Sequence, residues 1–91
     1  MKIRFTEKAK KDIDSVYFYS LKNFPESAQD VLDCIEHMID KLGVYPELGK
    51  IGRVSGTREL IIPHFPFFVA YEIEDDYINI LAILHQRQCW E

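Results

Sequence analysis

A chain of 91 residues suffices for one domain, spanning residues 1–91, and is too short for two. Its residues are 47% hydrophobic and 13% aromatic, which excludes a disordered polar chain and is enough for a packed core. The 11 Lys and Arg residues against 15 Asp and Glu residues give a formal net charge of −4, which disfavours sequence-independent binding to nucleic-acid phosphates.

The first predicted elements are a short strand and a helix. Residues 2–5 alternate polar and apolar side chains, as a strand does. Thr6 is a candidate N-cap because its hydroxyl can accept a hydrogen bond from the first turn, and Glu7 adds negative charge there. Apolar residues then recur every three or four positions from Ala9 onwards, which predicts a helix that runs to about Asn23 and buries one face.

A second helix is predicted after Pro25, because proline fits the first turn of a helix but not its interior. Its apolar residues mark a single face over four turns: Ala28, Val31, Leu32, Ile35, Met38, Ile39 and Leu42. Gly43 follows where a left-handed C-terminal cap is expected. The short break between the two helices predicts an antiparallel helical hairpin.

Strand patterns dominate the rest of the chain. A connector with one tight turn, residues 45–50, precedes a predicted strand at 58–62, which Pro63 ends. Two further strands are predicted at 67–73 and 77–85, joined by an acidic turn. The order of elements predicts an α+β fold: an N-terminal strand, then an antiparallel helical hairpin packed on one face of a mostly antiparallel sheet with three C-terminal strands.

The last two strands are more apolar than a half-exposed sheet requires. Residues 67–71 and 80–84 are apolar on both alternating sets of positions, which predicts that both sheet faces need cover. The helical hairpin can cover only one face, and the tail after His85, even with Trp90, is too short to cover the other. We therefore expect a partner to bury part of this face. The alternative is that twist and curl of the sheet hide it within the domain.

Three arginines and one histidine are candidates for chemistry near the C-terminal strands. Arg53 and Arg58 flank a flexible turn, Arg87 follows the last strand, and His85 ends it. Arginine binds phosphate through a two-point fork, and histidine suits general acid or base work, so a nuclease site is one interpretation. The structural alternatives are an ion pair of Arg58 with an acidic residue such as Glu72 and a strand-end hydrogen bond of His85.

Metal, cofactor and membrane sites are not predicted. Cys34 and Cys89 lack a metal or redox spacing and are expected to be reduced thiols, and the three histidines show no zinc spacing. The glycines form no phosphate-binding loop, and we expect no cofactor. No apolar run reaches the ~18 residues of a membrane helix, and residues 1–5 lack a signal-peptide core, so the expected location is the cytoplasm.

Several segments together resemble the ParE branch of the RelE/ParE toxin superfamily. They are residues 53–60, 67–71 and 80–87, with 5–9 and 45–49 in support, so the resemblance covers almost the whole chain. It implies the toxin of a bacterial type II toxin-antitoxin module. In such families a cognate antitoxin holds the toxin inactive and wraps its sheet and helices with a segment that folds on binding.

The resemblance implies one of two activities. RelE-like members cleave messenger RNA in the ribosome, whereas ParE-like members poison DNA gyrase. A charge of −4 would oppose approach to dense RNA, the last residues lack the expected tyrosine, and the ending at 84–87 resembles ParE. We therefore expect a toxin that binds gyrase, inhibits growth and performs no covalent chemistry. The alternatives are a ribosome-dependent mRNA endoribonuclease that uses Arg58 and His85, and a degenerate member that binds its antitoxin and poisons nothing.

The expected binding surfaces follow from this assignment. The helical hairpin and the turn between Arg53 and Arg58 are expected to face the target, with Arg53, Arg58 and Arg87 as target-binding residues. The sheet is expected to face the antitoxin, with the contact residues Phe67, Phe68, Val69, Tyr71, Leu81, Ile83 and Trp90. The expected assembly is a hetero-oligomer with the antitoxin, without membrane attachment and without direct sequence-specific nucleic-acid binding by the chain alone.

Overall fold

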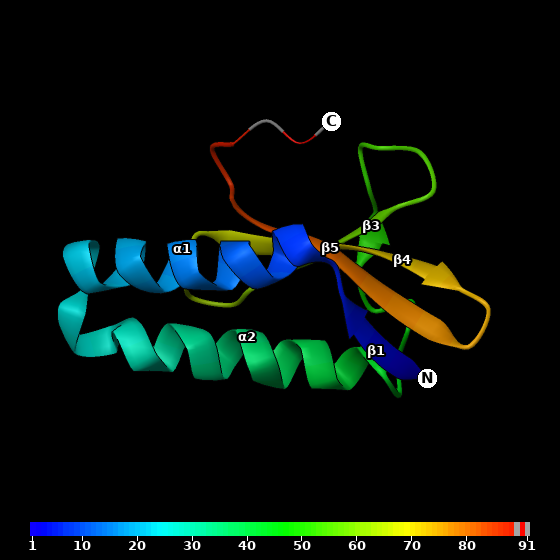
Figure 1. The fold of residues 1–91 in the computed structure, drawn as a ribbon, viewed down its shortest axis with the longest axis horizontal. Coiled ribbons are helices and arrows are strands. Elements are labelled where there is room, and N and C mark those ends of the chain that lie inside the picture. The colour runs from blue at the N-terminus through cyan, green and yellow to red at the C-terminus, as the bar shows by residue number, and fades with distance from the viewer. Residues whose placement is uncertain (89, 91) are drawn as a thin grey trace.

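Two helices lie side by side against a five-stranded sheet in the computed structural model, which describes residues 1–88 and 90 (Figure 1). In chain order the elements are β1 (Lys2–Phe5), α1 (Glu7–Asn23), the 3-10 turn η1 (Pro25–Ser27), α2 (Ala28–Leu42), β2 (Lys50–Ile51), β3 (Arg58–Ile61), β4 (Phe67–Glu74) and β5 (Tyr77–His85). The predicted α+β arrangement of an N-terminal strand, a helical hairpin and three C-terminal strands is confirmed. No helix of the described residues is long and apolar enough to cross a membrane.

Thr6 fastens the start of α1 to the sheet. Its side-chain oxygen accepts a hydrogen bond from the Ala9 N–H at 3.1 Å, as predicted for an N-cap, and its hydroxyl donates to the Leu81 carbonyl at 3.0 Å. One side chain therefore satisfies a free helix donor and links α1 to β5. This link places the first turns of α1 over the last strand of the sheet.

The end of α2 differs from the prediction. Gly43 has a φ of −62°, so it is helical and not the left-handed cap that the sequence predicted. The N-terminal ammonium of Met1 donates to the Gly43 carbonyl at 2.7 Å, and a Cβ at position 43 would lie 3.2 Å from the Met1 carbonyl oxygen. A glycine is therefore favoured here by the close approach of the N-terminus to the helix and not by backbone conformation.

The sheet has the strand order β1-β5-β4-β3-β2. β1 pairs with β5 in parallel and the other pairs are antiparallel, which confirms a mostly antiparallel sheet. β2 was not predicted, because a two-residue strand is too short to show a periodic pattern. It pairs with the start of β3, so the connector after α2 continues into the edge of the sheet.

A β-bulge accounts for much of the apolar run in β5. Ala70 lies opposite Ala82, but Tyr71 lies opposite Ile80, so Leu81 is an extra residue on β5. The extra residue reverses the alternation of side chains along the strand. Ile80 and Ile83 therefore both belong to the core beneath the helices, although they are three positions apart.

The second sheet face is covered by the chain itself, so the prediction of an uncovered face is wrong for the described residues. Phe68, Ala70, Ala82 and Leu84 form a second apolar cluster there, and each is at most 5% exposed. Trp90 packs against this cluster. The Arg53 guanidinium lies 5.1 Å from the centre of the Phe68 ring. The bulge in β5, the tail and the turn before β3 together cover the sheet face that the helical hairpin does not reach.

The buried Tyr71 hydroxyl holds the connector between α2 and β2. It donates to the Pro46 carbonyl at 2.7 Å and accepts from the Gly49 N–H at 2.8 Å. A Cβ on Gly49 would lie 2.7 Å from this hydroxyl, so the backbone can approach only because position 49 is a glycine. Burial raises the pKa of Tyr71, which keeps the hydroxyl protonated and able to donate.

Replacing Tyr71 with Phe is expected to lower the free energy of unfolding by about 1–3 kcal/mol, because a partly buried carbonyl and a buried N–H lose their partner. Urea denaturation with matched m-values measures this loss. Tyr45→Phe is the control, since Tyr45 is 63% exposed and should change stability by less than about 0.5 kcal/mol. Equal stability of the two variants would show that the hydroxyl does not hold the connector.

Candidate functional site

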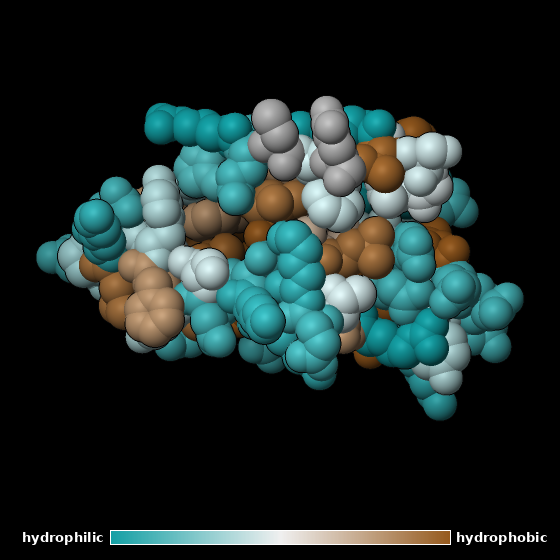
Figure 2. All heavy atoms as spheres, turned by 45° about the horizontal axis from the view of Figure 1, so that its top comes forward, coloured by the Kyte–Doolittle hydropathy of each residue, from teal (hydrophilic) through white to brown (hydrophobic). Residues whose placement is uncertain are grey.

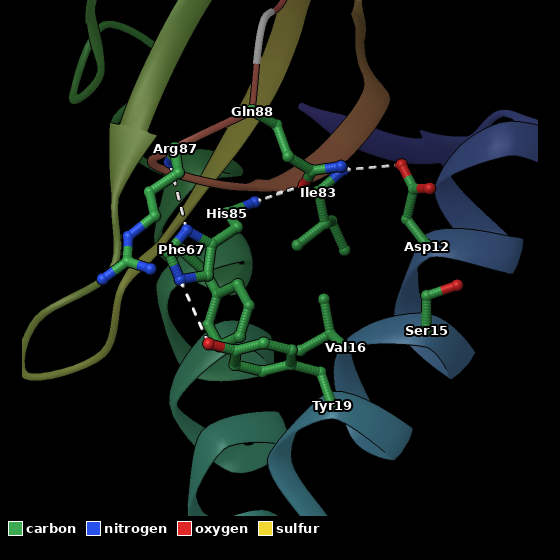
Figure 3. Close-up of a pocket in the computed structure, with 9 residues that line it drawn as sticks. All are labelled: Asp12, Ser15, Val16, Tyr19, Phe67, Ile83, His85, Arg87 and Gln88. Carbon is green, nitrogen blue, oxygen red and sulfur yellow. Dashed lines mark hydrogen bonds between the residues drawn. The ribbon is translucent and has the colours of Figure 1, made fainter. Parts of the chain in front are cut away.

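A pocket of about 430 Å³ lies between α1 and the end of β5. One face of α1 supplies four of its side chains, and the strands and the residues after β5 supply the others (Figure 3). The lining residues are Asp12, Ser15, Val16, Tyr19, Phe67, Ile83, His85, Arg87 and Gln88. Figure 2 shows hydrophobic side chains in the hollow beneath the C-terminal segment and hydrophilic ones around it. Such a mixture of apolar and polar groups can hold a small ligand or a partner's side chain.

His85 is held from several sides in this pocket. The Arg87 N–H donates to His85 Nδ1 at 3.1 Å, and the His85 N–H donates to Gln88 Oε1 at 2.7 Å (Figure 3). Because Nδ1 accepts, a neutral ring carries its proton on Nε2, which lies 3.4 Å from the Tyr19 hydroxyl. These contacts are the strand-end hydrogen bonds expected for a structural role. They also leave a phenol and an imidazole in contact, and these form an acid-base pair in this pocket.

Asp12 also lines the pocket, but its carboxylate ties α1 to β5. Asp12 Oδ2 accepts from the Ile83 N–H at 3.0 Å and from Lys8 Nζ at 2.8 Å. A carboxylate with these partners is a poor metal ligand or general base. Among the described residues, no group of three His, Cys, Asp or Glu side chains is placed to hold a metal ion.

Arg58 lies far from His85, so the structure does not bring together the predicted Arg58–His85 pair. Arg58 is opposite Tyr71 and His85 is opposite Phe67, a separation of four residues along β4, or about 13 Å at 3.3 Å per residue. The Arg58 guanidinium donates to the Gly49 carbonyl at 2.7 Å.

The ion-pair partner of Arg58 also differs from the prediction. Its guanidinium lies 3.8 Å from the Glu47 carboxylate, whereas the suggested partner, Glu72, accepts a hydrogen bond from Asn79. Arg58 therefore fastens the connector before β2 to the sheet. Together with Tyr71 it fixes the position of Gly49.

Arg53 forms the most highly connected ion pair of the described chain, with Glu59. Its backbone N–H, Nε and Nη2 each donate to the Glu59 carboxylate at 3.0 Å, and the Glu59 side chain is only 2% exposed. Burial opposes ionisation of this carboxyl, but the hydrogen bonds and charge of Arg53 prevail and lower the pKa of Glu59. Glu59 was missed as a key residue. Its position in the predicted strand, directly before Leu60 and six positions after Arg53, was the available signal.

The predicted surface residues differ widely in exposure. Arg87 is exposed, and its guanidinium makes no hydrogen bond or ion pair with residues 1–88 and 90. Of the seven residues expected to contact an antitoxin, only Leu81 and Trp90 are partly exposed. The other five, Phe67, Phe68, Val69, Tyr71 and Ile83, are at most 3% exposed. These five act as packing residues in the described chain, and direct contact with a partner would require their cover to move.

Comparisons with known proteins give concordant results. The family model described as the ParE toxin of the type II toxin-antitoxin system, parDE, matches residues 3–90. A curated relative from Sinorhizobium fredii, the protein Y4kP, carries the name of a toxin. It is 35% identical over 89 residues, which cover 98% of this chain and 92% of the relative.

Solved structures give the same fold. The chromosomal ParDE toxin-antitoxin system of P. aeruginosa contains a chain that superposes with a TM-score of 0.83 at 26% identity, covering 93% of this chain and 95% of that one. The toxin-antitoxin complex RelBE2 of Mycobacterium tuberculosis matches with a TM-score of 0.60 at 25% identity, covering 92% and 95%. The YoeB-YefM complex of Staphylococcus aureus matches in fold alone, with a TM-score of 0.57 at 18% identity, covering 93% and 95%.

Proposed function

This chain belongs to the ParE toxin family of type II toxin-antitoxin systems, and from that premise we propose that it stops bacterial growth by binding DNA gyrase and that a cognate antitoxin neutralises it. The observation that carries the proposal is the separation of Arg58 from His85, which lie on either side of β4 and four residues apart along it. A nuclease needs phosphate-binding and proton-transferring groups at one scissile bond. A toxin that acts by binding a protein needs an accessible surface instead.

The outer end of α1 supports such a surface. Phe18 is 68% exposed and Leu21, three positions later on the helix, is 41% exposed. Large apolar side chains exposed close together are typical of protein interfaces. Arg87 contributes an accessible cation at the rim of the adjoining pocket, whereas Arg53 and Arg58 are engaged with their own chain. The target-binding role proposed for these arginines is therefore best supported at Arg87.

An antitoxin partner is supported by the nature of the relatives. The P. aeruginosa neighbour is described as a ParDE toxin-antitoxin system, and the M. tuberculosis neighbour as a toxin-antitoxin complex. The partly exposed Leu81 and Trp90 are the sheet-face residues that an antitoxin can reach directly. The other five proposed antitoxin-contact residues are buried, and their packing would support that surface. We propose a hetero-oligomer of toxin and antitoxin as the resting state.

A second candidate is a RelE-like messenger RNA endoribonuclease. The contact between Tyr19 and His85, with Arg87 at the rim of the same pocket, is the observation that favours it. In that mechanism Arg87 takes the phosphate-binding role first considered for Arg58, and His85 transfers a proton. The two candidates differ in whether toxicity depends on His85.

Replacing His85 with Ala is expected to leave toxicity within about twofold of the original chain, because gyrase binding requires no proton transfer. Expression of either the original chain or the His85 variant without the antitoxin should trigger the DNA damage response and filamentation. Growth, cell length and a damage reporter measure these effects, and the melting temperature confirms that the variant folds. Tyr19→Phe, which keeps the ring and removes the hydroxyl, is the matched control. Prompt translation arrest, with a loss of about 10²–10⁴-fold in the His85 variant, would establish the nuclease instead.

A further inference from the structure

We propose that the pocket between α1 and β5, together with the exposed face of α1 beside it, receives an acidic and apolar segment of DNA gyrase. One apolar side chain of that segment would enter the pocket, and neighbouring Asp or Glu residues would meet cations around it. This inference rests on the proposed gyrase target and adds to it the surface of the toxin and the chemistry of the contact.

One stripe of α1 runs along the pocket. Lys11, Ser15, Phe18 and Lys22 follow one another at spacings of four, three and four residues, so they lie on the same face of the helix. All four residues are exposed. Ser15 lines the pocket, and Phe18 is 68% exposed. The stripe therefore presents a large apolar side chain with a lysine at each end.

The cations around the pocket are available to a partner. No ion pair joins Lys11 or Lys22 to another residue in the described part of the chain. Arg87, at the opposite rim, is also exposed (Figure 3). Asp12 is the acidic residue that lines the pocket, and Lys8 neutralises it at 2.8 Å. The surroundings of the pocket are therefore locally basic, although the whole chain carries a net charge of −4.

The pocket itself suits an apolar side chain. Val16, Phe67 and Ile83 form the apolar part of its lining. The Tyr19 ring stands edge-on to the rings of Phe67 and His85, with centroids 5.8 and 5.4 Å apart. Edge-to-face contacts of this kind are favourable and hold the rings in place. A pocket formed before the partner arrives reduces the cost of ordering on binding.

Other occupants match this surface less well. A nucleic-acid strand gains nothing from an apolar lining, and the net charge of −4 opposes its approach. A second copy of this chain could offer the acidic helix α2, but residues 28–42, all of which the structure describes, include no exposed large apolar side chain. An acidic protein segment with an accessible apolar side chain satisfies both the cations and the pocket.

Charge reversal on the stripe provides the first test, with purified DNA gyrase as the probe in surface plasmon resonance. Lys11→Glu and Lys22→Glu are each expected to weaken binding by at least about tenfold, because they place like charges against an acidic segment. Lys10→Glu is the matched control, since it makes the same change on the same helix at a residue outside the stripe. It should bind within about twofold of the original chain, and circular dichroism establishes that all three variants fold.

Filling the pocket provides the second test. Ser15→Trp places a large ring at the pocket and is expected to weaken gyrase binding by at least about tenfold, because a partner's side chain can no longer enter. His37→Trp is the control, since His37 is exposed on α2 and does not line this pocket. It should bind within about twofold of the original chain. Melting temperatures of both variants separate lost binding from lost folding.

Photochemical cross-linking identifies the partner segment. Benzoylphenylalanine at position 18 keeps an aromatic ring on the stripe, and the same residue at position 45 is the control, because Tyr45 is a 63% exposed aromatic residue of the connector. Position 18 should cross-link to a gyrase segment in which Asp or Glu flanks an apolar residue, and position 45 should not.

The possible failures are distinguishable. Cross-links from position 18 to DNA or to a second copy of this chain would overturn the surface and leave gyrase as the target. Gyrase binding that tolerates the Lys11, Lys22 and Ser15 substitutions would do the same. Absence of any binding between gyrase and the original chain would reject the proposed target itself, and this surface with it.

Discussion

Replacing Arg53 with Ala is expected to lower the free energy of unfolding by about 3 kcal/mol, the lower end of the range for breaking a buried ion pair. The substitution removes the two hydrogen bonds that the Arg53 guanidinium donates to the Glu59 carboxylate, which is 2% exposed, and keeps the one from the backbone N–H. Arg53 itself is 49% exposed, so water already screens part of the interaction, which is why the lower end of the range applies. The substitution also uncovers the Phe68 ring on the second sheet face.

The double variant Arg53→Ala/Glu59→Gln separates the cost of the unpaired Glu59 charge from the other effects of removing Arg53. Removing the negative charge should restore part of the lost stability, because an uncharged amide costs less to bury than an unpaired carboxylate. Urea denaturation of the original chain, both single variants and the double variant gives the coupling energy directly. If the stability losses of the two single variants add up to the loss in the double variant, Arg53 and Glu59 do not stabilise the fold as a pair.

The same pair predicts a pH dependence. The pKa of Glu59 is lowered in the folded state from its ordinary value of 4.5. The ionised Glu59 carboxyl therefore contributes its full stabilisation at pH values above the pKa of the unfolded state. This contribution is lost as the pH falls through the lower pKa of the folded state. In the Glu59→Gln variant this acid-side loss should be absent. Thermal melting between about pH 3 and pH 7 compares the two chains, and parallel profiles would contradict the role of this carboxyl.

Charge reversal at Arg87 is expected to reduce toxicity by about 10–100-fold, because a like charge placed in an interface costs several kcal/mol. Arg87→Glu should change the free energy of unfolding by less than about 0.5 kcal/mol, since the side chain is exposed. A selective loss of function would therefore report on the target surface and not on folding. Plating efficiency after induction measures toxicity, and urea denaturation measures stability.

Lys41→Glu is the matched control for Arg87. Lys41 is also exposed and undergoes the same change of charge, but it lies in the last turn of α2, away from the pocket and the outer end of α1. This variant should remain as toxic as the original chain. Equal toxicity of the Arg87 and Lys41 variants would exclude Arg87 from the target surface.

Local sequence signals predicted most elements of the fold. Thr6 caps α1 as its position indicated, and the strand predicted at 77–85 has those bounds in the structure. The bulge at Leu81 could not be predicted, because one extra residue changes pairing without changing the apolar composition of the strand. The expectation of an uncovered sheet face failed for this reason, and because Trp90 and the turn before β3 fold over it.

Local sequence patterns could not predict the candidate pocket. Tyr19 and His85 are 66 positions apart, and their contact depends on how α1 crosses the end of β5. The partner of Arg58 was missed for a related reason: the connector between α2 and β2 brings Glu47 close to Arg58, whereas Glu72 accepts a hydrogen bond from Asn79. Residue types indicated which side chains were capable of chemistry, but the topology decides which of them meet.

Supercoiling by purified DNA gyrase is the most direct test of the proposed action of this toxin. The purified chain should inhibit supercoiling at concentrations comparable to that of the enzyme, and the His85→Ala variant should inhibit equally well. Addition of the antitoxin should restore activity. In a parallel reaction, messenger RNA on translating ribosomes should remain intact. Undiminished gyrase activity, together with cleavage of ribosome-bound messenger RNA that requires His85, would contradict the proposed target.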